Sequence, residues 1–140
     1  ALLSFAYSLL GSDCAAALEG AGLDPYVGFL HRARPGRRSL ALDLMEELRT
    51  VLADRFVLSC INQKVLNAKH FEKQENGAVL LTEEGRRAFL NAWQQKKREV
   101  ITHPFLKEKL CWGLVPYVQA LLLARTLRGD LEVYPPFFWK

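Results

Sequence analysis

Three side chains in the first third of the chain have the residue types of a metal site: His31, Asp43 and Glu46. Asp43 and Glu46 are three positions apart in a leucine-rich run with helical spacing, so their carboxylates fall on neighbouring turns of one helix face. His31 precedes a basic turn and is close enough in sequence to fold back over the start of that helix. An imidazole nitrogen and carboxylate oxygens suit Mg²⁺ or Mn²⁺ when water and a substrate phosphate complete the octahedron. The pattern therefore indicates a divalent-metal site.

Four arginines separate the histidine from the carboxylates: Arg32, Arg34, Arg37 and Arg38. Together they carry as much positive charge as the whole net excess of +4. A basic cluster of this kind favours a partner that bears phosphate. It would face a polyanion beside the metal.

A simpler interpretation of the same residues stays open. Acidic residues followed by an arginine on one helix, here Asp43, Glu46, Glu47 and Arg49, are typical of a solvated face with ion pairs. Three candidate ligands at open spacing match no closed metal motif. An arginine-rich turn can also serve solubility alone. Residue types by themselves leave both interpretations standing.

Two helices and a turn must position the candidate site. Asp24 and Pro25 predict the start of a short helix from Tyr26 to Leu30, which His31 closes. Pro35-Gly36 forces a turn, and Ser39 can cap a long helix from Leu40 to about Leu66. Asp43 and Glu46 then lie in its first two turns, where the positive end of the helix dipole favours carboxylates or bound phosphate. Its apolar residues are expected to face the core: Val51, Leu52, Phe56, Val57, Cys60 and Ile61.

The rest of the chain predicts further helices and one hairpin. An N-terminal helix with an apolar stripe stops at Gly20 and Gly22. Asn76-Gly77 predicts a hairpin between segments 70–72 and 78–80, with His70 on its surface. A helix from about Glu83 to Arg98 and last helices over 105–127 follow. The fold class is thus all-α, a multi-helix bundle with one small β-hairpin in a single domain, residues 1–140.

Several classes of protein are disfavoured. The 3 cysteines are far apart and form no disulfide framework or CxxC zinc pattern, which favours a reducing, cytoplasmic location. The longest apolar run is too short to span a bilayer, and no basic region precedes the N-terminal apolar stretch as in a signal peptide. No P-loop, GxSxG element or local nucleophile-base pair is present. The sequence therefore does not support a serine or cysteine hydrolase.

Several long segments resemble one family in order and spacing. They are GLDPYVGFLH, SLALDLMEELR, GAVLLTEEGRRAFLNAWQQKK, ITHPFLKEKL and QALLLARTLRGDLEVYPPFFWK. Together they resemble the CRISPR-associated spacer integrases, the first protein of the CRISPR adaptation module, and in particular a type I-C-like branch. The resemblance covers essentially the whole chain. It implies the C-terminal, helical catalytic domain of that fold, whose N-terminal β-rich domain is absent from this sequence.

The resemblance also implies an activity. The implied protein is a metal-dependent DNA endonuclease and integrase, which inserts captured foreign DNA fragments as new spacers into the CRISPR array by transesterification. In the family a glutamate, a histidine and an acidic residue hold Mg²⁺ or Mn²⁺. The histidine falls on His31 and the acidic pair on Asp43 and Glu46, with Glu46 favoured as the direct ligand. The family's glutamate is expected upstream of Ala1, so this stretch alone should bind metal weakly and have little activity.

The implied partners are DNA, a second copy of the chain, the small ferredoxin-like second CRISPR adaptation protein, and an end-processing nuclease. Under this interpretation Arg32, Arg34, Arg37 and Arg38 hold DNA phosphates without reading sequence. The alternative is a non-catalytic helical module that binds DNA or a partner protein. Metal dependence separates the two, since a pure scaffold does not need His31 or Glu46.

Overall fold

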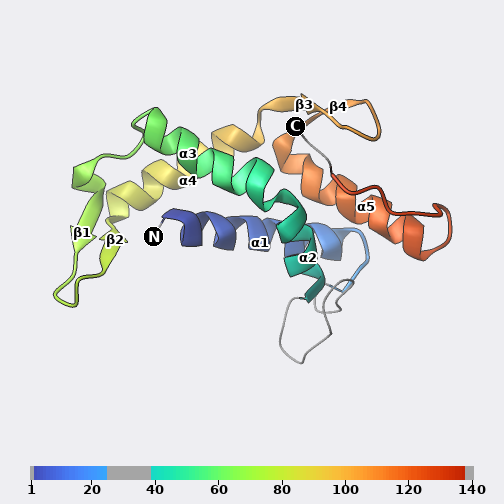
Figure 1. Ribbon diagram of the computed structural model, residues 1–140, viewed down its shortest axis with the longest axis horizontal. Coiled ribbons are helices and arrows are strands. Elements are labelled where there is room, and N and C mark those ends of the chain that lie inside the picture. Colours follow the sequence, from blue (N-terminus) through green and yellow to red (C-terminus); the bar gives the residue numbers. More distant parts are fainter. Residues whose placement is uncertain (1, 25–38, 138–140) are drawn as a thin grey trace.

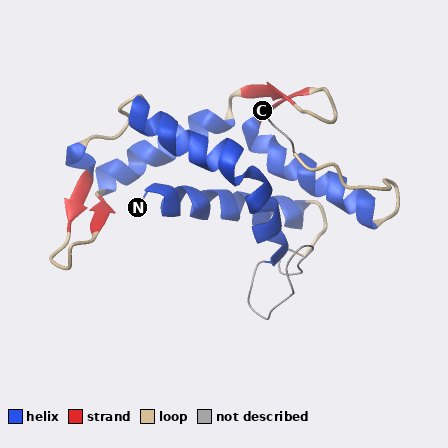
Figure 2. Cartoon of the chain, viewed as in Figure 1, coloured by secondary structure: helices blue, strands red, loops and turns tan. Residues whose placement is uncertain are grey.

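The structure is a computed structural model that describes residues 2–24 and 39–137. Figure 1 shows a mainly helical chain, and Figure 2 shows its strands as two small antiparallel pairs in separate places at the edge of the helices. The helical class is therefore confirmed, and a second strand pair adds to the predicted hairpin. The described elements are, in chain order, α1 (Leu2–Gly20), α2 (Ser39–Leu48), the π-helix η1 (Arg49–Asp54), α3 (Arg55–Asn62), the 3₁₀ turn η2 (Ala68–His70), β1 (Phe71–Lys73), β2 (Val79–Leu81), α4 (Glu83–Lys97), β3 (Val100–Thr102), β4 (Lys109–Cys111), the 3₁₀ turn η3 (Trp112–Leu114) and α5 (Val115–Leu127).

Helix α1 is the element against which α2 and α5 pack (Figure 1). Its fully buried side chains Ala6, Leu10, Cys14 and Leu18 recur every four residues, so they line one stripe of the helix. Gly22, at φ +83°, takes the left-handed conformation that ends the helical path, as predicted. None of the helices in the described ranges is sufficiently long and apolar to cross a bilayer.

The long helix predicted from Leu40 is a continuous run of α2, η1 and α3 that ends at Asn62. A row of buried side chains spaced by four runs along it: Leu40, Leu44, Leu48, Leu52, Phe56 and Cys60. On a helix of about 3.6 residues per turn such a row drifts around the axis, and the wider π turn in its middle counteracts the drift. The row therefore stays on the core, while Ile61 is 56% exposed, so its predicted burial is wrong.

The predicted hairpin forms as β1 and β2, within one residue of the expected segments. Gly77 has φ +87°, a conformation that glycine adopts without strain, and the Asn76 side chain accepts a hydrogen bond from the Ala78 N–H. The prediction of a surface His70 is wrong, since this residue is only 6% exposed. Its Nδ1 accepts the Asn67 N–H at 3.0 Å, and its backbone closely approaches Gly85 of α4.

The second strand pair, β3 and β4, replaces the start of the helices predicted over 105–127. Val100, Ile101 and Thr102 are β-branched and favour a strand, and they pair with Cys111, Leu110 and Lys109. Helix α5 begins only at Val115. Pro116 lies in its first turn, where a missing N–H costs nothing, and so it does not divide the helix.

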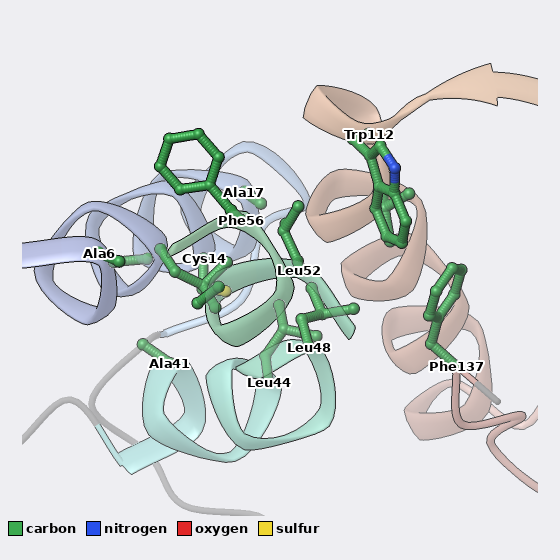
Figure 3. Packing of buried hydrophobic residues seen from close by; sticks show 14 of the residues in the cluster. Ala6, Cys14, Ala17, Ala41, Leu44, Leu48, Leu52, Phe56, Trp112 and Phe137 are labelled. Carbon is green, nitrogen blue, oxygen red and sulfur yellow. The ribbon is translucent and has the colours of Figure 1, made fainter. Parts of the chain in front are cut away.

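The C-terminal segment packs back on the domain. Figure 3 shows Trp112 and Phe137 close together beside α5, and Leu44, Leu48 and Leu52 pointing into the interior from successive turns. The rings of Trp112 and Phe137 meet edge to face with centroids 5.7 Å apart. Residues 131–137 therefore run back past α5 toward α2, where the candidate ligands lie.

Candidate functional site

Helix α2 places its three carboxylates on one pocket with a volume of about 610 Å³. Asp43 is nearly buried, with 7% of its surface exposed, whereas the Glu46 side chain is 46% exposed. The other walls come from the end of α5 and the segment that follows it: Thr126, Glu132, Val133, Tyr134 and Pro136. The structure thus brings the predicted pair together and adds Glu47 and Glu132, so the pocket favours a cation.

Among the described residues, Glu46 is held from the solvent side. Its Oε1 accepts a hydrogen bond from Arg49 Nη1 at 3.1 Å, and both side chains are more than 40% exposed. The guanidinium of Arg49 also lies 6.0 Å from the ring centroid of Tyr7 in α1. A pair this exposed contributes at most about 0.5 kcal/mol, so little opposes the release of Glu46 to another cation.

Glu47, one residue further, is held from the protein side. Its Oε1 accepts the Phe137 N–H at 2.7 Å and Gln119 Nε2 at 2.9 Å. The Tyr134 hydroxyl lies 2.7 and 2.9 Å from its two oxygens. Burial raises the pKa of the Glu47 carboxyl, and the hydrogen bonds from Tyr134, Phe137 and Gln119 act in the opposite direction. Glu47 therefore ties α2 to the C-terminal segment.

Gln119 extends this contact to the turn between β3 and β4. Its Nε2 contacts Glu47, the Tyr134 hydroxyl at 2.7 Å and the Pro135 carbonyl at 3.2 Å, while its Oε1 lies 2.7 Å from His103 Nε2. The backbone N–H groups of residues 105 and 106 both point at His103 Nδ1, at 3.1 and 3.0 Å. Nδ1 is therefore the acceptor and Nε2 carries the proton, which assigns the Gln119 oxygen to the His103 side.

His31, the first predicted ligand, lies outside the described residues, as do Arg32, Arg34, Arg37 and Arg38. Within residues 2–24 and 39–137 no group of three histidine, cysteine or acidic side chains is arranged to hold a metal ion. The pocket fits Mg²⁺ or Mn²⁺ in its donor chemistry, because Asp43 and Glu46 offer oxygen ligands on one concave surface. The described donors are thus a partial ligand set.

Sequence reasoning missed the network of Gln119, His103 and Tyr134. A signal existed for Gln119, since it is the one polar residue in the run VQALLLA and is fully buried. A polar residue inside an apolar helix needs a buried partner. Its partners cannot be identified from sequence, because they lie 15 to 72 positions away.

The model of the family described as CRISPR associated protein Cas1 matches residues 1–95. A CRISPR-associated endonuclease Cas1 of Rhodospirillum rubrum is 62% identical over 140 residues, which is 100% of this chain and 41% of the relative. A second Cas1 endonuclease, from Chlorobaculum tepidum, is 52% identical over 139 residues, with 99% of this chain and 40% of the relative covered. The chain belongs to the Cas1 family. It spans about two fifths of the length of these relatives.

Solved structures of Cas1-like proteins share the fold of this Cas1 domain. A casposase bound to an integration product aligns with a TM-score of 0.84 and 30% identity, covering 99% of this chain and 41% of the casposase. A Cas1 protein from Thermotoga maritima aligns with a TM-score of 0.81 and 30% identity, covering 91% of this chain and 39% of that protein. A chain of a partial Cas6-RT-Cas1–Cas2 complex aligns with a TM-score of 0.76 and 26% identity, covering 99% of this chain and 41% of that chain. The fold is thus that of the predicted C-terminal domain.

Proposed function

We propose that this Cas1 domain supplies part of the active site of a metal-dependent DNA endonuclease and integrase of CRISPR adaptation. The observation that carries the proposal is the single pocket lined by Asp43 and Glu46 in a chain that belongs to the Cas1 family. The reaction is a transesterification. The 3′-hydroxyl oxygen of a captured fragment bonds to a phosphorus of the CRISPR array and loses its proton, while the bond to the leaving 3′-oxygen breaks and that oxygen gains a proton.

The residues divide the work between metal and DNA. Glu46 is the proposed direct ligand, with His31 as a second ligand and Asp43 as ligand or supporting residue. A bound Mg²⁺ or Mn²⁺ supplies charge stabilisation at the phosphate during transfer. Glu46 is suited to ligation, since its partner within the described ranges is the exposed guanidinium of Arg49, which is readily displaced.

The arginines Arg32, Arg34, Arg37 and Arg38 are the proposed binding residues for DNA phosphates. Replacing Arg37 and Arg38 by alanine should weaken DNA binding and reduce the dependence of the binding constant on salt, by about 0.9 in logarithmic slope for each DNA phosphate that the protein no longer neutralises. Titration of a labelled duplex at several salt concentrations measures this slope. A slope equal to that of the unchanged chain would remove both arginines from the DNA interface.

The proposed partners are a second copy of the chain, the ferredoxin-like second adaptation protein and an end-processing nuclease. Support for a second protein comes from the Cas1–Cas2 assembly named above. Support for the nuclease comes from a Cas4 exonuclease/Cas1 endonuclease fusion of Geobacter sulfurreducens, which is 40% identical over 137 residues, 98% of this chain and 24% of the fusion.

A strand-transfer assay with Mn²⁺ tests the proposal. This chain is fused behind the preceding residues of the Rhodospirillum rubrum relative, to which it is 62% identical, and this fusion is termed the extended chain. The extended chain should join a short duplex into a repeat-bearing plasmid. His31→Ala and Glu46→Ala should reduce joining by about 100-fold or more, which is the upper end of the cost of losing even a supporting residue of a metal site.

Glu99→Ala is the matched control for Glu46→Ala. Glu99 is also an exposed glutamate, paired with a basic side chain at i,i+3 spacing, with Lys96 Nζ 3.2 Å away, and it does not line the acidic pocket. Joining should survive this change. Equal joining by the Glu46→Ala and Glu99→Ala variants would instead favour the non-catalytic helical module.

A further inference from the structure

The two adjacent glutamates of α2, Glu46 and Glu47, differ in the number and burial of their hydrogen-bond donors. A carboxylate has about four lone-pair positions in total. Glu47 accepts from three different donors, and its hydrogen-bond distances to them are all 2.9 Å or shorter. Among the described residues, Glu46 accepts one hydrogen bond, from an exposed arginine. Buried and half-buried donors therefore occupy most of the lone-pair positions of Glu47, whereas the donor described at Glu46 is exposed and easily displaced.

The bonds of Glu47 join two walls of the pocket. One wall is α2, with Asp43 and Glu46, and the other is the segment after α5, with Glu132 and Tyr134. Gln119 lies between them, fully buried, and its single amide contacts Glu47, the Tyr134 hydroxyl and the Pro135 carbonyl. His103, also fully buried, orients this amide from behind. Gln119 thus bonds both walls at once and adds to the direct bonds from Tyr134 and Phe137 to Glu47.

We propose that Gln119 and Glu47 are positioning residues that fix the acidic face of α2 against the C-terminal segment, and that Glu47 is not itself a metal ligand. This inference rests on the proposed function, because it assigns a purpose to the pocket that those walls enclose. Glu47 acts as the hydrogen-bond acceptor of Gln119, Tyr134 and Phe137, a role that a neutral carboxamide oxygen can also fill.

The geometry predicts that glutamine can replace Glu47. The Oε1 of the introduced glutamine can accept hydrogen bonds from Gln119, Tyr134 and Phe137, as the carboxylate oxygen of Glu47 does. Its new Nε2 can donate to the Tyr134 hydroxyl, now 2.9 Å from the other oxygen, because that hydroxyl has a second lone pair. Leucine in place of Gln119, by contrast, removes the hydrogen bonds that the Gln119 amide makes to Glu47, to the Tyr134 hydroxyl and to the Pro135 carbonyl.

The test measures binding of Mn²⁺ alone to the extended chain, by the loss of the free-ion electron paramagnetic resonance signal. Glu47→Gln should leave the half-saturating Mn²⁺ concentration within about twofold, whereas Gln119→Leu should raise it by about tenfold, the low end of the cost of losing a supporting residue of a metal site. Tyr134→Phe, which keeps the ring and removes only the hydroxyl, should raise it by less. Loss of Mn²⁺ binding in Glu47→Gln would make Glu47 a ligand and overturn the proposal.

Hydrogen exchange separates positioning from general stability and from the metal proposal. Gln119→Leu and Tyr134→Phe should speed amide exchange in residues 42–48 and 132–137 of the 140-residue chain. Trp93→Phe is the control, since it removes a 3.2 Å bond from Nε1 to Asp13 and packing away from the pocket. If Trp93→Phe lowered Tm as much as Gln119→Leu and sped amide exchange in these two segments equally, the positioning role would be overturned. Failure of the unchanged extended chain to bind Mn²⁺ would count against the proposed function, and the exchange result would still decide the positioning role.

Discussion

Replacing Glu46 and Glu47 in turn by alanine should have very different effects on stability, because Glu47 is a buried anchor and Glu46 an exposed side chain. Glu47→Ala removes the acceptor of Gln119 Nε2, of the Tyr134 hydroxyl and of the Phe137 N–H. Hydrogen bonds to a charged acceptor contribute about 1.5–3 kcal/mol each, and relief of the buried charge offsets part of the loss. We expect the free energy of unfolding to fall by about 3–5 kcal/mol, because three donors lose their acceptor at about 1–3 kcal/mol each and the relief of the buried charge offsets part of that sum.

Glu46→Ala removes the pair with Arg49, the one ion pair of this side chain in the part of the protein that the structure describes; the Glu46 and Arg49 side chains are 46% and 42% exposed. Such a pair contributes at most about 0.5 kcal/mol, and the higher helix propensity of alanine offsets a few tenths of it. We therefore expect a change within about 0.5 kcal/mol. The two variants differ by one position on the same helix, so each is the other's control for handling and expression.

Thermal and urea unfolding of the 140-residue chain measure both changes. A chain of this length has an unfolding entropy of about 0.3 kcal/mol/K, so Glu47→Ala should lower Tm by about 10–15 °C and Glu46→Ala by less than about 2 °C. An unchanged urea m-value would show that both variants lose stability without a change in compactness. Equal shifts in Tm, or a larger shift for Glu46→Ala, would refute the distinction between the buried anchor Glu47 and the exposed Glu46.

Two further changes test the packing. Gly85→Ala should lower the free energy of unfolding measured in urea by about 1–3 kcal/mol, because the new Cβ would lie 2.6 Å from the His70 carbonyl oxygen. This clash outweighs the higher helix propensity of alanine. Gly11→Ala is the control and should be neutral or stabilising, because the atom nearest to its new Cβ is Met45 Sδ at 3.5 Å. Burial raises the pKa of the Cys60 thiol to about 11 from an ordinary 9.0, so the folded chain holds this proton more tightly, and the stability it contributes below pH 9 is lost as pH rises toward 11. Alkylation of Cys60 mapped by mass spectrometry should accelerate up to about pH 11, and a plateau near pH 9 would contradict the burial.

Signals that lie close together in the sequence predicted the fold well. Asn76-Gly77 set the first hairpin, and Thr82 caps α4 by accepting the Gly85 N–H at 3.1 Å, as its position before two glutamates indicates. The second strand pair lacks such a turn sequence. Its connection depends on the buried side chain of His103, which accepts the backbone N–H groups at 105 and 106, and on Lys107 at φ +59°. The prediction from helix propensity alone therefore started the last helices at residue 105, whereas α5 begins at Val115.

The candidate site was only partly predictable, for a physical reason. Helical spacing shows that Asp43 and Glu46 share a face, and neighbouring residues on a helix point about 100° apart, so Glu47 must point elsewhere. What Glu47 meets there is decided by Gln119 and Phe137, which lie 72 and 90 positions further along the chain. Spacing thus identifies which carboxylates can reach one pocket. Long-range hydrogen bonds decide which of them is already occupied by buried and half-buried donors, and by that criterion Glu46 is a better candidate ligand than Glu47.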